Sequence, residues 1–149
     1  MRVLVQRVTH ASVVVAGQTL GEIDRGYLLL VGIGHDDSQA TADRLAKKIV
    51  GLRLFPNDEG KFDRSLLDIA GGVLVVSQFT LMGNPRKGNR PSFTDAAPPG
   101  VASPLCDYFC ESLKRLGAAR VESGRFGADM QVSLCNDGPV TLWLDSETL

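Results

Sequence analysis

Short apolar, β-branched segments separated by glycine-containing turns fill the first third of the chain. Such segments occur at 3–8, 12–15 and 20–23, and turns fall at Ala16-Gly17-Gln18 and Asp24-Arg25-Gly26. This arrangement is typical of antiparallel hairpins. The unbroken apolar run at 27–31 predicts a further strand that is buried on both faces. The pattern therefore favours a mostly β fold.

Two later segments carry the signals of α-helices. Asp36, Asp37 and Ser38 are candidate N-caps for a helix whose apolar residues at 42, 45, 46, 49 and 50 follow helical spacing. The second helix is expected to start with Ser103 as its cap and Pro104 at its first position, and to stop at Gly117.

The remaining predicted strands lie at 73–76, 121–123, 130–134 and 140–144. Asn136-Asp137-Gly138-Pro139 has the composition of a turn between the last two strands. No repeat or interdomain linker interrupts residues 1–149, so we expect a single domain. Its predicted class is α+β, mostly β: an antiparallel β-barrel-like sheet with two main helices packed on it.

Charge and cysteine content narrow the classes of function. A net charge of −1 and a pI of about 6.1 argue against a protein that coats nucleic acid through bulk charge. The 3 cysteines lack C-x-x-C spacing and only His10 and His35 could extend a metal site, so we expect a cytoplasmic protein without metal or cofactor. Charge comes too early for a signal peptide, and the apolar run at 27–33 is too short for a bilayer, so no membrane partner is expected.

Ser77-Gln78-Phe79-Thr80 directly follows the predicted buried strand at 73–76. The end of a strand places small polar side chains and free backbone N–H groups at the mouth of a pocket, where they suit an ester substrate. Alternatively, the hydroxyls satisfy only local backbone groups. No Ser-His-Asp pattern and no G-x-S-x-G motif is present, and both histidines are distant in sequence.

The only concentrated positive segment is Arg86-Lys87-Gly88-Asn89-Arg90-Pro91, in a stretch without carboxylates between Asp68 and Asp95. A flexible loop with three cations suits contact with phosphates. Phe93, just beyond it, has the character to stack on a base or to anchor the loop. A solvated loop without a partner is the alternative.

Gly138-Pro139 lies between two predicted strands, and local composition favours a tight turn there. A second interpretation rests on the low cost of a cis X-Pro bond, which can turn adjacent carbonyl groups toward the same side of a cavity. The sequence leaves both interpretations open.

Three segments in order, at this chain length, resemble the signature segments of the D-aminoacyl-tRNA deacylase family: Ser77-Gln78-Phe79-Thr80-Leu81, Lys87-Gly88-Asn89-Arg90-Pro91-Ser92-Phe93 and Asn136-Asp137-Gly138-Pro139-Val140-Thr141. Residues 1–8 and 124–130 are also similar to the family, so the resemblance covers the whole chain. Each motif alone is weak, whereas three in order are specific.

The resemblance implies a homodimer of β-barrel-like subunits, with two active sites at the subunit interface. It implies hydrolysis of the ester that joins a D-amino acid to the terminal ribose of tRNA. Ser77, Gln78, Phe79 and Thr80 match the catalytic pocket segment, whose backbone N–H groups hold the substrate carbonyl. Thr80 matches a position once assigned as nucleophile, but no activating base is visible near it in the sequence. The 2′-hydroxyl of the tRNA is instead implied to activate water.

Gly138 and Pro139 match the family's Gly-cisPro motif, which enters the pocket of the partner subunit and rejects L-amino acids sterically. Glycine has no side chain to reject, so clearance of glycyl-tRNA is also implied. Arg7 and Met130 match positions that support the motif. Lys87 and Arg90 are the implied tRNA phosphate contacts.

Two other functions remain possible from the sequence. One is a non-catalytic dimeric RNA-binding module that uses the basic loop, Arg86 to Arg90. The other is a general esterase with Ser77 or Thr80 as its nucleophile.

Overall fold

Eleven elements succeed one another in the computed structural model, which describes all residues 1–149. In chain order they are β1 (Arg2–Val15), β2 (Gln18–Ile23), β3 (Gly26–Gly32), α1 (Gln39–Gly51), β4 (Phe55–Pro56), β5 (Phe62–Arg64), β6 (Gly72–Ser77), the 3₁₀ helix η1 (Phe79–Met82), α2 (Pro99–Arg115), β7 (Arg120–Ser123) and β8 (Gln131–Asp145).

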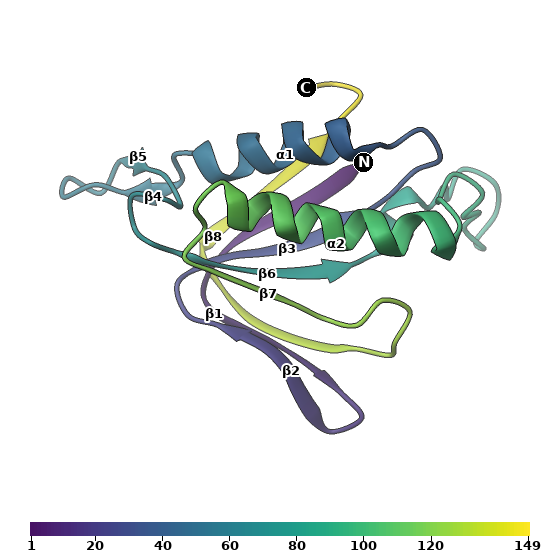
Figure 1. The fold of residues 1–149 in the computed structure, drawn as a ribbon, viewed down its shortest axis with the longest axis horizontal. Coiled ribbons are helices and arrows are strands. Elements are labelled where there is room, and N and C mark those ends of the chain that lie inside the picture. Colours follow the sequence, from purple (N-terminus) through teal and green to yellow (C-terminus); the bar gives the residue numbers. More distant parts are fainter.

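The main sheet has the strand order β2-β1-β3-β6-β7. Strands β3 and β2 pair with successive parts of one edge of β1, residues 2–8 and 11–15, and β8 pairs with its opposite edge. Strand β1 is antiparallel to β2, β3 and β8. The sheet curves until β2 approaches β7, which gives the barrel-like shape in Figure 1. The predicted fold class is therefore confirmed.

Two pairings in this sheet, β3 with β6 and β6 with β7, are parallel and were not expected from the hairpin-like spacing. Parallel neighbours need a long crossover connection. Here α1 with the β4–β5 hairpin links β3 to β6, and α2 links β6 to β7.

Both helices lie on one side of the sheet and pack against each other (Figure 1). The larger core, 24 buried residues, fills the space between helices and sheet, and a second cluster of 7 lies on the opposite sheet face, inside its curve. Tyr27, Leu29 and Val31 belong to the first cluster and Leu28 to the second. This alternation confirms that the strand at 27–31 is buried on both faces.

Polar contacts fix α1 against α2. Helix α1 begins after Ser38, one of the three candidate caps, whose hydroxyl accepts the Thr41 N–H. The Asp43 carboxylate accepts hydrogen bonds from Ser112 (2.6 Å) and Tyr108 (2.9 Å) of α2 and also pairs with Arg115. These hydrogen bonds, Ser112 first, hold the pKa of Asp43 below its usual range.

Helix α2 begins earlier than the sequence suggested. Pro98 is its N-cap and Pro99 its first residue, so Ser103 is not the cap and Pro104 lies inside the helix. Two prolines satisfy the same first-turn preference, and sequence alone favoured the later one. The predicted stop is confirmed, because Gly117 adopts a φ of +97° just beyond the helix. No helix of the structure is both long and apolar enough to cross a membrane.

Two long strands of the structure each combine two segments that were predicted as separate strands. Segments 3–8 and 12–15 are parts of β1, and β8 includes residues 131–134 and 140–144, so that only Met130 of the predicted segments lies outside it. The predicted turn at 136–139 is thus wrong: β8 runs through it and stays paired with β1 on either side.

Candidate active site

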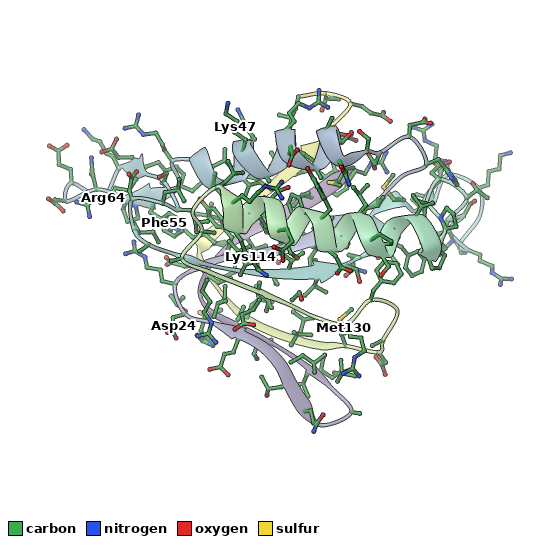
Figure 2. The ribbon with its side chains drawn as sticks, in the orientation of Figure 1. Asp24, Lys47, Phe55, Arg64, Lys114 and Met130 are labelled. Carbon is green, nitrogen blue, oxygen red and sulfur yellow. The ribbon has the colours of Figure 1, made fainter.

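A cavity of about 280 Å³ opens at the carboxyl end of β6. Its lining combines the end of β6 and the start of η1 with the loop between β7 and β8: Val76, Ser77, Gln78, Phe79, Phe126, Gly127, Ala128, Asp129, Met130 and Val132. Figure 2 shows Met130 where this loop meets β8. The structure therefore brings Ser77, Gln78 and Phe79 together with Met130, although some 50 residues separate them.

The backbone after β6 leaves donors free beside this cavity. The Gln78 N–H extends the sheet by donating to the Val31 carbonyl (2.7 Å), and η1 begins with the bond from the Leu81 N–H to the Gln78 carbonyl (3.2 Å). The N–H groups of Phe79 and Thr80 consequently have no acceptor within the helix. Such groups are suited to hold a carbonyl oxygen that gains negative charge.

Thr80 is not among the residues that line the cavity, and its hydroxyl accepts a hydrogen bond from the Gln78 side-chain amide. Asp129 is the only ionisable side chain in the lining. The two histidines lie elsewhere: His10 bonds to Thr9 and His35 to the Thr94 carbonyl. The cavity thus holds neither a Ser-His-Asp arrangement nor a histidine base for the hydroxyls.

Thiol chemistry is also disfavoured beside the cavity. Cys106 and Cys110 line a smaller space of about 30 Å³ that shares Ser77 and Phe126 with the main cavity. Burial raises the pKa of Cys106 to about 12 and that of Cys110 to about 11. Both thiols therefore stay protonated near neutral pH and are poor nucleophiles. No group of three or more His, Cys, Asp or Glu side chains is placed to hold a metal ion.

The wall formed by Phe126, Gly127, Ala128 and Asp129 was missed as a site by the sequence analysis. Its signal was the glycine-containing connection between the strands at 121–123 and 130–134. The wall is packed closely: a Cβ on Gly124 would lie 2.5 Å from the Met130 sulfur, so a larger residue there would require the Met130 side chain to shift. Gly124 also donates its N–H to the Val75 carbonyl, which ties the loop to β6.

Gly138 and Pro139 form part of a bulge in β8. On β1, Gln6 pairs with Thr141 and Val8 with Asn136, so Arg7 alone faces the four residues 137–140. Gly138 has a φ of +127° and the Gly138–Pro139 bond is cis. Asn136 spans the bulge, because its side-chain oxygen accepts the Val140 N–H (3.1 Å). This bulge, residues 136–141, replaces the predicted turn.

Arg7 holds the bulge from the opposite strand. Its Nε donates to the Asp137 carbonyl (3.1 Å) and lies 3.3 Å from the Asp137 carboxylate, and its Nη1 donates to the Leu54 carbonyl (2.6 Å). The Arg7 side chain is only 8% exposed. Arg7 therefore contacts the Gly138 segment of its own subunit, and Met130 lines the cavity.

Within one subunit, the bulge does not reach the cavity: neither Gly138 nor Pro139 lines it. The bulge is attached through Arg7 and Leu54 to the segment that leads into the β4–β5 hairpin. This hairpin and the loop between β7 and β8 lie on opposite sides of Figure 1.

The basic loop lies next to the cavity. Asn84 and Ser92 close its base with two backbone hydrogen bonds. The ring of Phe93 packs edge to face on that of the cavity residue Phe79, with 5.1 Å between the ring centroids. Lys87 and Arg90 are exposed at the loop tip, and neither forms an ion pair. The positive charge of the loop is thus free for a partner near the cavity mouth.

A model of the family "D-Tyr-tRNA(Tyr) deacylase" matches residues 4–145. The D-aminoacyl-tRNA deacylases of Chloroherpeton thalassium and Thermomicrobium roseum are 60% and 58% identical to this chain over 148 and 149 residues. These alignments cover 99% and 100% of this chain, and 97% and 96% of the two relatives.

Two solved structures are similar over nearly their whole length. A "c-Myc DNA Unwinding Element Binding Protein" has a TM-score of 0.91 at 41% identity, covering 97% of this chain and 98% of that one. A "probable eukaryotic D-amino acid tRNA deacylase" has a TM-score of 0.83 at 18% identity, covering 96% and 97%, and so supports the fold alone. The chain belongs to the D-aminoacyl-tRNA deacylase family, as its three motifs predicted.

Proposed function

We propose that this protein hydrolyses D-aminoacyl-tRNA to a free D-amino acid and tRNA. The observation that carries the proposal is the family match over residues 4–145, together with a cavity built from the matching segment Ser77–Gln78–Phe79. The reaction needs water to attack the ester carbonyl carbon, the bond to the ribose oxygen to break, and a proton to reach that oxygen. The cytoplasm, where tRNA is charged, is the location that this function requires.

The proposed catalysis uses backbone donors rather than a protein nucleophile. The unpaired N–H groups of Phe79 and Thr80 would stabilise the oxyanion that forms on the carbonyl oxygen. The Thr80 hydroxyl already accepts a bond from Gln78, and no histidine lines the cavity. The terminal ribose 2′-hydroxyl of the substrate is the proposed group that activates water.

Selection against L-amino acids is assigned to Gly138 and Pro139 of a second subunit. Neither residue lines the cavity of its own subunit, so a role at a cavity requires a partner copy. Phe79 (56% exposed) and Trp143 (50% exposed) offer apolar surface for such a homodimer. Glycine carries no side chain to reject, so glycyl-tRNA is a further proposed substrate.

Lys87 and Arg90 are the proposed tRNA phosphate contacts. Their loop carries unpaired positive charge and is joined to the cavity through the contact of Phe93 with Phe79. Counterion release makes this type of contact salt dependent. Replacing both cations with alanine should raise KM for aminoacyl-tRNA and flatten its salt dependence.

The direct test compares D-Tyr-tRNA with L-Tyr-tRNA as substrates of the purified protein. Rapid release of D-tyrosine with the L-ester intact is the expected result. Equal rates on both esters, or no hydrolysis of the D-ester, would refute the proposal. A protein that binds tRNA salt-dependently without cleaving the ester would be the RNA-binding module instead.

A second experiment separates substrate-assisted hydrolysis from a general esterase. Ser77→Ala and Thr80→Ala should each retain hydrolysis, whereas D-Tyr-tRNA that lacks the terminal 2′-hydroxyl should not turn over. A trapped acyl-enzyme, lost in either alanine variant, would instead identify the esterase.

A further inference from the structure

Phe62 is an exposed aromatic residue whose ring lies against a buried cation. Its side chain is 59% exposed and belongs to neither hydrophobic cluster. The Arg7 guanidinium carbon lies 5.5 Å from the ring centroid, within range of a cation–π interaction. Phe62 is thus placed on Arg7 rather than in the core.

The β4–β5 hairpin fixes where Phe62 lies. At its base, the buried Phe55 stacks on Tyr27 at 5.1 Å, and Phe62 pairs with Pro56 across the two strands. Figure 2 shows Phe55 and Arg64 in this part of the molecule, beyond the end of α1. The same segment supplies the Leu54 carbonyl that accepts from Arg7.

Arg7 is therefore held on one side by the hairpin segment and on the other by the bulge. Its Nε bonds to Asp137, its Nη1 to Leu54, and its Nη2 would lie 3.1 Å from a Cβ on Gly138. A free arginine side chain has about 2 kcal/mol of rotamer entropy to lose when it is fixed. The aromatic ring adds a third contact to these two hydrogen bonds and so further restricts the guanidinium.

We infer that Phe62 is a positioning residue that orients Arg7 and thereby fixes the bulge that carries Gly138 and Pro139. The inference rests on the proposed function of those two residues as the element that rejects L-amino acids. Steric rejection depends on placement to a fraction of an ångström, so looser packing behind Gly138 lowers selectivity. Within its own subunit, Phe62 does not line the cavity.

Phe62→Leu and Phe62→Trp test this role. Leucine keeps an apolar side chain but removes the π face, whereas tryptophan keeps the face. Leu67→Ala, which trims another exposed apolar side chain nearby in the sequence (41% exposed), is the matched control. Because Phe62 lies outside both cores, all three variants are expected to fold, which circular dichroism checks.

Two readouts distinguish the inference from the proposed function. The first is the NMR resonance of the Arg7 Nε–H group, which requires no activity. Phe62→Leu should speed its exchange with water, whereas Phe62→Trp and Leu67→Ala should preserve slow exchange; the chemical shift itself is not the criterion, because loss of the ring current changes it in any case. The second is the ratio of kcat/KM for D-Tyr-tRNA to that for L-Tyr-tRNA, which should fall about fivefold in Phe62→Leu alone, as loss of a typical cation–π contact implies.

An unchanged exchange rate of the Arg7 Nε–H in Phe62→Leu would overturn the inference, whatever the activity of the protein. Faster exchange with an unchanged D/L ratio would overturn the part of it that concerns selection. A wild-type protein that hydrolyses both esters equally would refute the proposed function and with it the selective role, while the exchange rate still decides whether Phe62 orders Arg7.

Discussion

Gly138→Ala is the substitution that most sharply separates a functional bulge from one that only connects the two parts of β8. Gly138 has a φ of +127°, a conformation that costs a residue with a Cβ about 1–2 kcal/mol or more. The added Cβ would lie 2.8 Å from the Val140 Cγ2 and 3.1 Å from the Arg7 Nη2. Relief of these contacts shifts the Arg7 guanidinium by a few tenths of an ångström and strains its charged hydrogen bond to Asp137, which contributes about 1–3 kcal/mol.

The two contributions sum to about 2–5 kcal/mol of lost stability. A chain of this size loses about 2–4 °C in Tm per kcal/mol, so Tm should fall by roughly 4–20 °C. Thermal unfolding measures the fall, and hydrolysis of D-Tyr-tRNA below the transition should be impaired in the folded variant, because the bulge is displaced.

Gly60→Ala is the matched control for this prediction. Gly60 also has a positive φ, +78°, but nothing lies within 4 Å of a Cβ placed there. Gly60→Ala should lower the stability only by the backbone cost of a positive φ, about 1 kcal/mol, and should leave hydrolysis unchanged. If Gly138→Ala behaves like Gly60→Ala in both Tm and rate, the bulge is no more than a connection and our reasoning about it is wrong.

Three further predictions concern the fold and its ionisable groups. A Cβ on Gly26 would lie 1.8 Å from the Gly72 carbonyl oxygen in the β3–β6 pairing, so Gly26→Ala should yield unfolded or insoluble protein by circular dichroism; near-native Tm would contradict the pairing. Because hydrogen bonds from α2 lower the pKa of folded Asp43, its contribution to stability is present above the unfolded pKa of about 3.9 and is lost as the pH falls through the lower folded value. The Tm gap between wild type and Asp43→Asn should therefore shrink between about pH 6 and pH 3, and a gap independent of pH would refute this. In the folded protein near pH 8, iodoacetamide should alkylate the exposed Cys135 well before the buried Cys106, as mass spectrometry of peptides can measure.

The strand pattern carried most of the fold information. The apolar run at 27–31 predicted a strand buried on both faces. One face of this strand packs under the helices and the other packs inside the curve of the sheet, and both surroundings favour apolar side chains. The sequence also predicted where α1 begins, at the candidate caps Asp36, Asp37 and Ser38, since a local hydrogen bond to Ser38 decides that position. The start of α2 was not predicted, because Pro99 and Pro104 both satisfy the same local preference.

The bulge was beyond local prediction for a physical reason. Asn-Asp-Gly-Pro favours a turn by composition, but pairing with β1 on both sides keeps these residues in β8. Arg7 fixes them from 130 residues away, and its own anchors, Leu54 and Phe62, lie in a third segment. Likewise, only the folded chain brings the loop at Phe126 against the end of β6 to complete the cavity.

The most direct test of the account is a structure of the protein with a non-hydrolysable D-tyrosyl-adenosine analogue bound. We predict that its carbonyl oxygen accepts hydrogen bonds from the Phe79 and Thr80 N–H groups, with Gly138 and Pro139 of a second subunit beside the α-carbon. A carbonyl held by the Ser77 or Thr80 hydroxyl, or an analogue bound without any contact from a second subunit, would contradict it.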